Sequence, residues 1–208
     1  MVRDFSHFSF YLNRLLKDVY AQPPDPLHTS WTEQVMDEWI KNLMDVHSVL
    51  DVGCGQAFAQ PMFEKLGMQY TGVTLGEDYS EAKKLGRNVI NCDYSFLPYE
   101  DGSFDLVFAR HSLEYSPSPI PTLMEWRRVS KAFVCVVAPA PAHWGWTGAN
   151  HYSLANKEQL QFWITQAGMG LVWEKDNIWD GKLIEHWVMA QNNFLLLTFY
   201  RHINLLNL

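Results

Sequence analysis

The chain has 208 residues, of which 48% are hydrophobic and 19% are charged. These values are typical of a folded globular protein and exclude the highly charged, disordered class, and the length suits one domain. The formal net charge of -7 disfavours a nucleic-acid partner, because the average surface repels a phosphate backbone. The nearest approach to a basic patch is Arg127, Arg128 and Lys131, which we interpret as a solvated helix end favoured by the helix dipole.

Three cysteines, Cys54, Cys92 and Cys135, occur without a CxxC pair, and no secretory signal precedes them. This pattern predicts unpaired thiols in a reducing cytoplasm. No apolar run approaches the roughly 20 residues that a helix needs to cross a bilayer. We therefore expect a cytoplasmic protein without a membrane span, and contact with a membrane surface stays open.

Two helices are predicted before the first strand. Apolar residues recur at spacings of three and four from Phe8 to Val19, which is the spacing of one helix face. The prolines within residues 23–26 then force an extended link, after which Thr29 or Ser30 is expected to cap a second helix. That helix carries the apolar residues Val35, Met36, Trp39, Ile40 and Leu43.

Strand-like and helix-like segments alternate through the middle of the chain. The predicted buried strands are Ser48–Val52, Tyr70–Leu75, Asn88–Cys92, Asp105–Ala109 and Phe133–Val137. The predicted helices between them are Gln60–Leu66, Ser80–Leu85 and Ile120–Val129. This alternation implies right-handed parallel crossovers and an open, doubly wound α/β sheet.

The C-terminal part continues this pattern less regularly. Asn156–Gln166 is predicted to be a helix closed by Gly168, and Leu171–Lys175 and Phe194–Arg201 are predicted strands. The segment between Trp179 and Asn193 fits a helix, a strand or an insertion, and no internal repeat is present.

A loop rich in glycine follows the first predicted strand, which ends at Asp51 and Val52. Gly53 and Gly55 let a ligand approach the backbone, and free amides at the start of the next helix would favour an anionic group. A nicotinamide dinucleotide would require a third glycine where Phe58 stands, and its pyrophosphate would sit poorly beside Asp51. Two glycines occur in any tight turn, so the loop alone leaves its ligand open.

Three segments follow one another along the middle of the chain: Val49–Gly55, Asn91–Asp93 and Leu97–Val107. In this order they resemble motif I, the adenine-contacting acidic step and the approach to strand four of class I S-adenosylmethionine-dependent methyltransferases. The resemblance is to the type 11-like branch that is related to ubiquinone and menaquinone methyltransferases. It implies S-adenosyl-L-methionine as cofactor and a Rossmann-like, doubly wound, mostly parallel sheet of seven strands with helices on both faces.

The resemblance also implies which residues hold the cofactor. Asp93 would bind the adenine amino group and Tyr94 would flank the ring, although a strand-end cap is the alternative role for Asp93. The full implied set is Asp51, Gly53, Cys54, Gly55, Ala57, Thr74, Leu75, Asp93, Tyr94, Ala109 and Arg110.

Two of these positions depart from the family pattern. Ala57 replaces a glycine, and its small side chain should still fit. Thr74 replaces the acidic residue that holds the ribose hydroxyls, so one hydroxyl stands where a carboxylate would accept two hydrogen bonds. Thr74 puts the strength of ribose binding in doubt, and Glu77 or Asp78 could take over part of that role.

Methyl transfer requires alignment of the acceptor and exclusion of water, and it requires a base only when the acceptor atom carries a proton. The candidates follow strands four and five, where ligands bind in such sheets. His151 is the first choice, because Asn150–Ser153 resembles the family's histidine-containing entry to the helix before strand six; His111, His143 and Tyr152 come next. A pocket wall for His111 and a helix cap or tryptophan contact for His151 are the alternatives. No tight ligand spacing such as HExxH occurs, so no metal site is predicted.

The sequence predicts one domain over residues 1–208. Residues 1–46 form N-terminal helices that act as a lid or a dimer contact, residues 47–141 bind the cofactor, and residues 142–208 form a substrate loop and C-terminal strands. The predicted function is methyl transfer to a small-molecule or lipid-type acceptor by in-line displacement. A catalytically silent relative that acts as a regulatory or partner subunit is the alternative, motivated by Thr74. A homodimer is left open, and the acceptor and its reacting atom are not predicted.

Overall fold

The structure is a computed structural model that describes residues 25–144 and 150–192, apart from the side chains of His143 and Trp144. The predicted first helix, Phe8–Val19, and the predicted last strand, Phe194–Arg201, lie outside the described residues. In the described part, every helix is too short or too polar to cross a bilayer.

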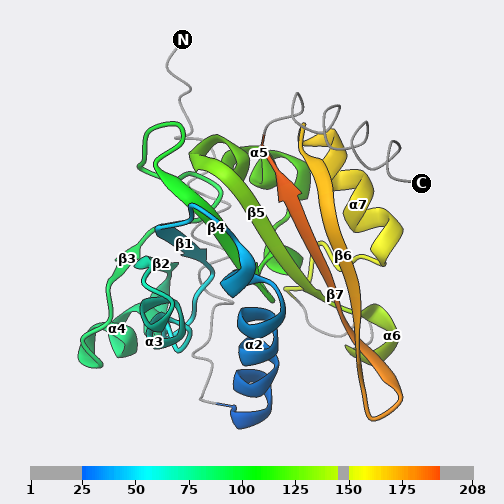
Figure 1. The fold of residues 1–208 in the computed structure, drawn as a ribbon, viewed down its shortest axis with the longest axis horizontal. Coiled ribbons are helices and arrows are strands. Elements are labelled where there is room, and N and C mark those ends of the chain that lie inside the picture. Colours follow the sequence, from blue (N-terminus) through cyan, green and yellow to red (C-terminus); the bar gives the residue numbers. More distant parts are fainter. Residues whose placement is uncertain (1–24, 145–149, 193–208) are drawn as a thin grey trace.

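A seven-stranded sheet forms the centre of the molecule, in the order β3-β2-β1-β4-β5-β7-β6 (Figure 1). The first five strands pair in parallel, and β7 runs antiparallel to both of its neighbours. The strands are β1 Ser48–Val52, β2 Gln69–Thr74, β3 Val89–Asn91, β4 Phe104–Arg110, β5 Ser130–Pro139, β6 Gly170–Trp179 and β7 Lys182–Gln191. The predicted Rossmann-like, mostly parallel sheet is confirmed.

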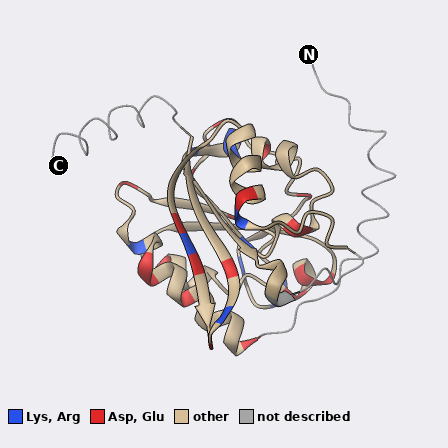
Figure 2. Ribbon diagram, turned by 90° about the vertical axis from the view of Figure 1, so that its right-hand side faces the viewer, with Lys and Arg blue, Asp and Glu red and all other residues tan. Residues whose placement is uncertain are grey.

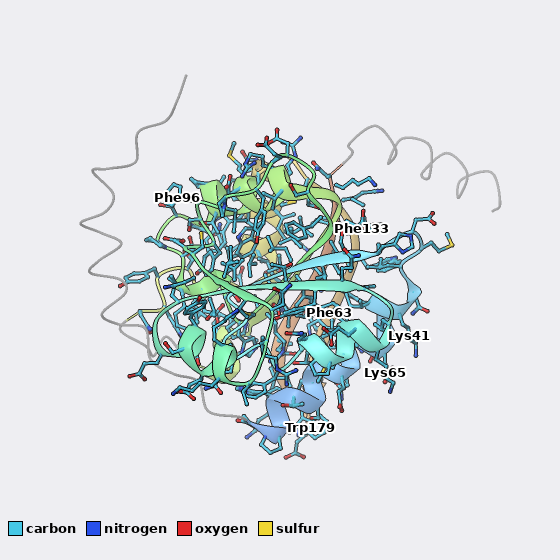
Figure 3. All side chains as sticks on the ribbon, turned by 90° about the vertical axis from the view of Figure 1, so that its left-hand side faces the viewer. Lys41, Phe63, Lys65, Phe96, Phe133 and Trp179 are labelled. Carbon is cyan, nitrogen blue, oxygen red and sulfur yellow. The ribbon has the colours of Figure 1, made fainter. Side chains whose placement is uncertain are left out.

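Helices cover both faces of this sheet, because successive strand residues point to opposite sides. In β4, Val107 packs into the cluster that contains residues of α5 and α7, whereas Phe108 packs into the cluster of α2, α3 and α4. Phe63 of α3 is buried against the sheet, while Lys65 at the end of the same helix is exposed (Figure 3). The helices are α2 Pro26–Glu38, η2 Ile40–Asn42, α3 Gln60–Lys65, α4 Gly76–Lys84, η3 Leu113–Tyr115, α5 Pro119–Val129, α6 Pro141–Trp144 and α7 Lys157–Gln166.

Helix α2 begins earlier than the sequence predicted. Asp25 caps it, and its side chain accepts hydrogen bonds from the backbone amides of Leu27 and His28 at 2.8 and 3.2 Å. Pro26 occupies the first turn, where its missing amide costs nothing, so the predicted cap at Thr29 or Ser30 is wrong. The earlier start brings the first turn of α2 over the carboxyl edge of the sheet.

Strands β6 and β7 form a hairpin in the segment that the sequence left unassigned. Asp180 and Gly181 connect them, and both have positive φ angles, of 50° and 71°. Two such residues make the tight turn that matches the twist of a hairpin. Because β7 runs antiparallel, its early residue Glu185 pairs with Pro139 at the end of β5. Glu185 therefore reaches the edge at which the parallel strands end.

The basic residues near the end of α5 differ in exposure: Lys131 is exposed, as predicted, whereas Arg128 is held by several partners. The guanidinium of Arg128 donates to the carboxylates of Glu125 and Asp101 and to the carbonyls of Leu97 and Tyr99. Figure 2 shows the basic positions in short, separate places along the described chain. These side chains hold the loop before β4 against α5.

Candidate functional site

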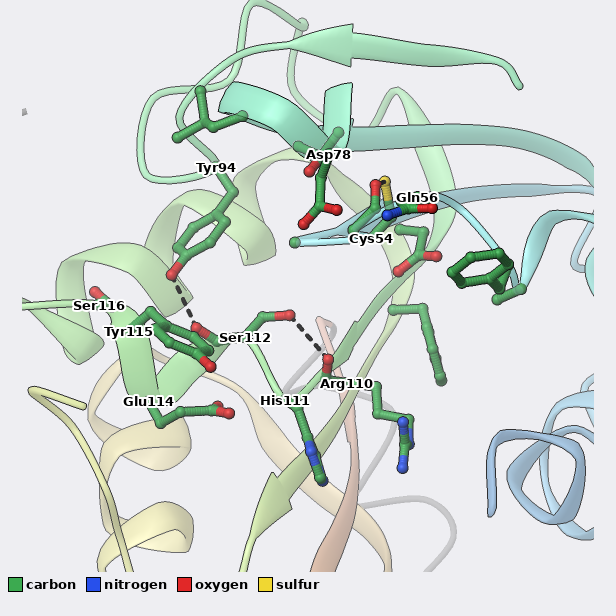
Figure 4. A pocket seen from close by; sticks show the side chains of 18 of the residues that line it. Cys54, Gln56, Asp78, Tyr94, Arg110, His111, Ser112, Glu114, Tyr115 and Ser116 are labelled. Atoms are coloured by element: carbon green, nitrogen blue, oxygen red, sulfur yellow. Dashed lines mark hydrogen bonds between the residues drawn. The ribbon is translucent and has the colours of Figure 1, made fainter. Parts of the chain in front are cut away.

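A cavity of about 760 Å³ lies at the carboxyl ends of the parallel strands. Its walls come from the loops after β1, β2, β3 and β4, from the first turns of α2, and from residues 150–152 (Figure 4). Ligands of open parallel sheets bind at this edge, where the strands end and the helices diverge. The cavity combines two halves, one formed by the loops after β1 to β3 and one formed by α2, η3 and residues 150–152.

The loop after β1 passes so close to the loop after β4 that only glycine fits at position 53. Gly53 has a φ of 70°, and a Cβ atom there would lie 2.4 Å from the Oγ of Ser112. The amides of Gly53 and Cys54 both donate to the carbonyl of Val73, at 2.9 and 3.1 Å. The expectation of free amides at a helix start is wrong for these two groups, because the neighbouring strand β2 takes them. Helix α3 begins only at Gln60.

Carboxylates surround the cavity beside this loop. Asp51 is 4% exposed, and it accepts a hydrogen bond from the hydroxyl of Tyr70 at 2.8 Å. Burial raises the pKa of Asp51 to about 7, against the opposing effects of Tyr70 and Arg110. Asp78 is also buried, and the position of a Cβ on Gly55 lies 3.8 Å from its Oδ2. Buried carboxylates at an open glycine suit a ligand with positive charge, and S-adenosylmethionine carries a sulfonium and an amine.

Asp93 and Tyr94 follow β3 and line the same half of the cavity. The Oδ1 of Asp93 accepts from the amide of Ser95 at 2.7 Å, which is the local turn that the sequence offered as the alternative role. The hydroxyl of Tyr94 donates to the carbonyl of Ser112 at 2.8 Å. The indole of Trp126 in α5 donates to the carbonyl of Tyr94 at 3.1 Å, and the two rings meet edge to face. Tyr94 is therefore fixed between two elements.

Most of the residues that the resemblance implied for the cofactor lie at the cavity. Its walls include Asp51, Gly53, Cys54, Gly55, Thr74, Leu75, Asp93, Tyr94 and Arg110. Ala57 and Ala109 are different, since both are buried in the core and neither lines the cavity. Ala57 has a positive φ of 58° and packs in the cluster beneath α3. Ala109 faces the cluster beneath α5 and α7, because its neighbours along β4 take the other face.

The other half of the cavity contains three of the four predicted catalytic candidates. His151 meets Tyr115 edge to face with the ring centres 4.9 Å apart, and its Nδ1 is buried without a hydrogen-bond partner among the described residues. Tyr152 stands at the rim and is 46% exposed, and His111 forms part of the wall. His143 belongs to α6, but its side chain lies outside the described part of the structure.

A buried network holds His111, and its centre is a residue that the sequence did not single out. One oxygen of Glu185 meets Arg110 at 2.6 Å and the Nε2 of His111 at 3.0 Å. The other oxygen accepts from Asn177 at 3.0 Å and from Trp187 at 2.9 Å. Burial and the nearby Arg110 lower the pKa of His111 to about 4, so this ring is neutral at physiological pH. The signal for Glu185 was the Asp-Gly pair of the hairpin that carries it.

Glu114 is the second residue that the candidate list missed. It lies in η3, lines the cavity and is only 2% exposed. Burial raises its pKa to about 8. The stretch Leu113–Tyr115 resembles the family's Leu-Glu-His, but no pattern in the sequence distinguishes the carboxylate of Glu114 from that of a surface glutamate.

The comparisons with known proteins agree with this arrangement. Residues 50–133 match a family model described as a methyltransferase domain. The chain is 29% identical over 175 residues to 2-methyl-6-phytyl-1,4-hydroquinone methyltransferase 1, chloroplastic, of Oryza sativa subsp. japonica, with 77% of this chain and 52% of that protein covered. It is 25% identical over 193 residues to the ubiquinone biosynthesis O-methyltransferase of Xanthomonas euvesicatoria, with 79% and 78% covered. The chain thus spans about half the length of the rice relative.

Solved structures share the fold at lower identity. A SAM-dependent methyltransferase from Aquifex aeolicus aligns with a TM-score of 0.65 and 20% identity, with 92% of this chain and 100% of that chain covered. The [4+2]-cyclase SpnF aligns with a TM-score of 0.63 and 19% identity, with 78% and 80% covered. These likenesses concern the fold, which carries more than one chemistry.

Residues 50–133 match the model of a methyltransferase domain of the type 11 family. The fold around them is shared with S-adenosylmethionine-dependent methyltransferases, so S-adenosyl-L-methionine is the cofactor that the comparisons indicate for this cavity.

Proposed function

We propose that the protein transfers the methyl group of S-adenosylmethionine to a small, ring-bearing acceptor in the half of the cavity between α2, η3 and residues 150–152. The observation that carries this proposal is the continuity of the cavity, which joins the cofactor loops to a second, aromatic-lined space. The named relatives include a hydroquinone methyltransferase and a ubiquinone biosynthesis O-methyltransferase, which supports an acceptor of quinone type. The unpaired thiols Cys54, Cys92 and Cys135 support a reducing cytoplasm as the setting.

Different residues of the cavity bind different parts of the cofactor and the acceptor. Asp51 and Asp78 hold the positively charged part and the ribose of the cofactor, and Asp93 and Tyr94 hold the adenine. When bound, the cofactor supplies a methyl group on a positively charged sulfur. His151 contacts the acceptor through its buried Nδ1, and α2 closes the space against water.

The presence of Thr74 does not require the protein to be a catalytically silent relative. Thr74 lines the cavity at the end of β2, and the buried carboxylate of Asp78 lies in the first turn of the following helix. We infer that Asp78, from this position, contributes to binding the ribose hydroxyls that the acidic residue of other family members would bind. We infer that the protein is catalytically active.

Calorimetric titration with S-adenosylmethionine and S-adenosylhomocysteine tests this proposal. We expect micromolar binding, on the order of −8 kcal/mol, to wild type. Gly53→Ala should lose it, since the new methyl group would strike Ser112. Asp93→Ala should weaken binding tenfold or more by loss of the adenine contact, about 1.4 kcal/mol.

Gly67→Ala is the matched control, because Gly67 also has a positive φ, of 80°, and no atom lies within 4 Å of the added group. It should carry the same backbone strain and bind as wild type does. Wild-type protein that binds neither ligand, or Gly53→Ala protein that binds both normally, would overturn the proposed cofactor site.

A further inference from the structure

Glu114 has a carboxylate oxygen that nothing in the described structure satisfies. Its side chain is 2% exposed, and Oε2 is buried without a hydrogen-bond partner among residues 25–144 and 150–192. Figure 4 shows the side chain among those that line the cavity, in the same region as His111 and Ser112. A buried polar atom without a partner is costly, and such atoms in native proteins often serve a ligand.

The backbone around Glu114 joins the two halves of the cavity. Two residues earlier, the hydroxyl of Ser112 donates to the carbonyl of Val52 at 2.8 Å, beside the glycine of the cofactor loop. On the other side, the amide of Ser153 donates to the carbonyl of Glu114 at 2.9 Å. The hydroxyl of Ser153 donates to the carbonyl of Ser116 at 2.5 Å. Glu114 is thus fixed between the cofactor loop and the segment that carries His151.

Charged and titratable groups reach Glu114 from several elements. Burial is the main influence and raises its pKa to about 8, while Arg110 of β4 lowers it and Glu185 of β7 raises it. Tyr94 from the loop after β3 also interacts with it electrostatically. A carboxyl group in this environment exchanges its proton near neutral pH, where a base for a weakly acidic hydroxyl is most effective.

The other polar groups of this half are less suited to accept a proton. Both oxygens of Glu185 already accept two contacts each, and His111 is held by one of them. Burial and Arg110 lower the pKa of His111, and burial lowers the pKa of His151, so both rings are weak bases. Glu114 combines a free acceptor atom with a position between the two halves.

We propose that Glu114 is the catalytic base of the reaction and that the acceptor presents a hydroxyl group to its Oε2. The inference rests on the proposed function and deepens it. The O–H bond of the acceptor breaks and its proton passes to Glu114, the oxygen lone pair forms the bond to the methyl carbon, and the electrons of the methyl–sulfur bond stay on sulfur. The relatives differ in the acceptor atom, since they include O-methyltransferases and also a sterol 4-C-methyltransferase of Caenorhabditis elegans. Glu114 favours oxygen as the acceptor atom.

The test compares wild type with Glu114→Gln, Glu114→Asp and the exposed control Glu33→Gln. Catechol and methylhydroquinone serve as acceptor probes, and mass spectrometry identifies the methylated product. We expect all four proteins to bind S-adenosylhomocysteine equally by calorimetry. Wild type, Glu114→Asp and Glu33→Gln should show a rate that rises with pH toward a plateau and should form an O-methyl product. In Glu114→Gln, kcat should be lower by about 100-fold or more, and the rate should no longer rise with pH.

Infrared difference spectroscopy gives a readout that needs no turnover. Wild-type protein at neutral pH should show carbonyl bands of protonated carboxyl groups that disappear on raising the pH. Glu114→Gln should lack the band of Glu114 and keep that of Asp51, whose pKa is also raised. The inference is overturned if the rate of Glu114→Gln is within about fivefold of the wild-type rate, or if that rate still rises with pH as in wild type. It is also overturned if the band of Glu114 is unchanged, if the product is methylated on carbon, or if wild type binds S-adenosylhomocysteine and methylates neither probe. Absence of cofactor binding would instead overturn the proposed function.

Discussion

We expect the carboxyl group of Asp51 to link cofactor binding to pH. Its pKa is raised to about 7 by burial, so the group is largely neutral below that value. A cationic ligand requires the carboxylate, and its binding must therefore expel a proton at lower pH. We expect the affinity for S-adenosylmethionine to increase up to about tenfold per pH unit below the pKa and to level off above it. Calorimetry at about pH 6 and about pH 8, in buffers of different ionisation enthalpy, measures both effects.

Asp51→Asn provides the control, because its amide oxygen can still accept from Tyr70. This variant should bind more weakly at high pH and release no proton. Equal wild-type affinity at the two pH values would contradict the role of Asp51.

Glu185 is expected to matter for stability more than for binding. Glu185→Gln leaves the guanidinium of Arg110 without its charge partner and turns an amide towards the donors Asn177 and Trp187. Loss of one partner of a buried ion pair typically costs about 3 to 5 kcal/mol of unfolding free energy. Urea unfolding measures it, with the exposed Glu174→Gln of β6 as a control that should change stability by less than about 0.5 kcal/mol. A loss for Glu185→Gln no larger than the control's would show that the network is dispensable.

The gathering of the residues after β1 to β3 at one cavity was predictable because they follow strands in fixed order, and the backbone alone brings those positions together. The acceptor half was less predictable. Glu185 reaches the cavity edge through a strand that periodicity did not reveal, and Glu114 differs from a surface glutamate only by its burial. Ala57 and Ala109 differ from the other implied residues, since their side chains are buried in the core and do not line the cavity.

Among the elements, the β6–β7 hairpin depends on its two-residue turn. Gly181 has a φ of 71°, and no atom lies within 4 Å of a Cβ placed there. Gly181→Ala therefore tests backbone strain alone and should cost about 1 kcal/mol, or roughly 2 to 4 °C in Tm. Thermal unfolding measures it beside Lys182→Ala, an exposed neighbour that should change Tm little. Equal Tm values for the two variants would mean that the turn tolerates a side chain.

The strength of each local signal explains which elements the sequence predicted. Strands β1 to β5 are short apolar runs between helices, a pattern that burial on both faces produces. In strand β7 the buried polar residues Glu185 and His186 interrupt the apolar positions, so neither alternation nor a continuous apolar run marks it as a strand. The predicted start of α2 was too late because proline occurs both in extended segments and in the first turn of a helix. The cap formed by Asp25 shows that Pro26 has the second role.

At the scale of the whole molecule, the ligand-free protein should be less stable in mild alkali than near neutrality. Asp51 and Glu114 have folded pKa values of about 7 and about 8, above those of exposed carboxyl groups. The folded state therefore holds protons that the unfolded chain has already lost, and stability decreases as pH rises through these values. Between about pH 6.5 and about pH 9 we expect a decrease on the order of 2 kcal/mol.

Urea unfolding at both pH values measures this decrease. The double variant Asp51→Asn, Glu114→Gln should remove most of it, because neither replacement titrates. A double variant that loses as much stability as wild type would assign the effect to other groups.

The contact between Trp126 and Tyr94 gives the protein an internal optical signal. A ligand ring that packs against Tyr94 is separated from the indole of Trp126 only by the Tyr94 side chain. The indole N–H of Trp126 already donates to the carbonyl of Tyr94. Occupation of the site should therefore change the tryptophan fluorescence without any added label. Titration with S-adenosylhomocysteine should give a saturable intensity change that is reduced in Trp126→Phe and retained in Trp173→Phe, a partly exposed residue of β6. The same emission would allow the rate of ligand entry to be followed by stopped flow before any acceptor is known.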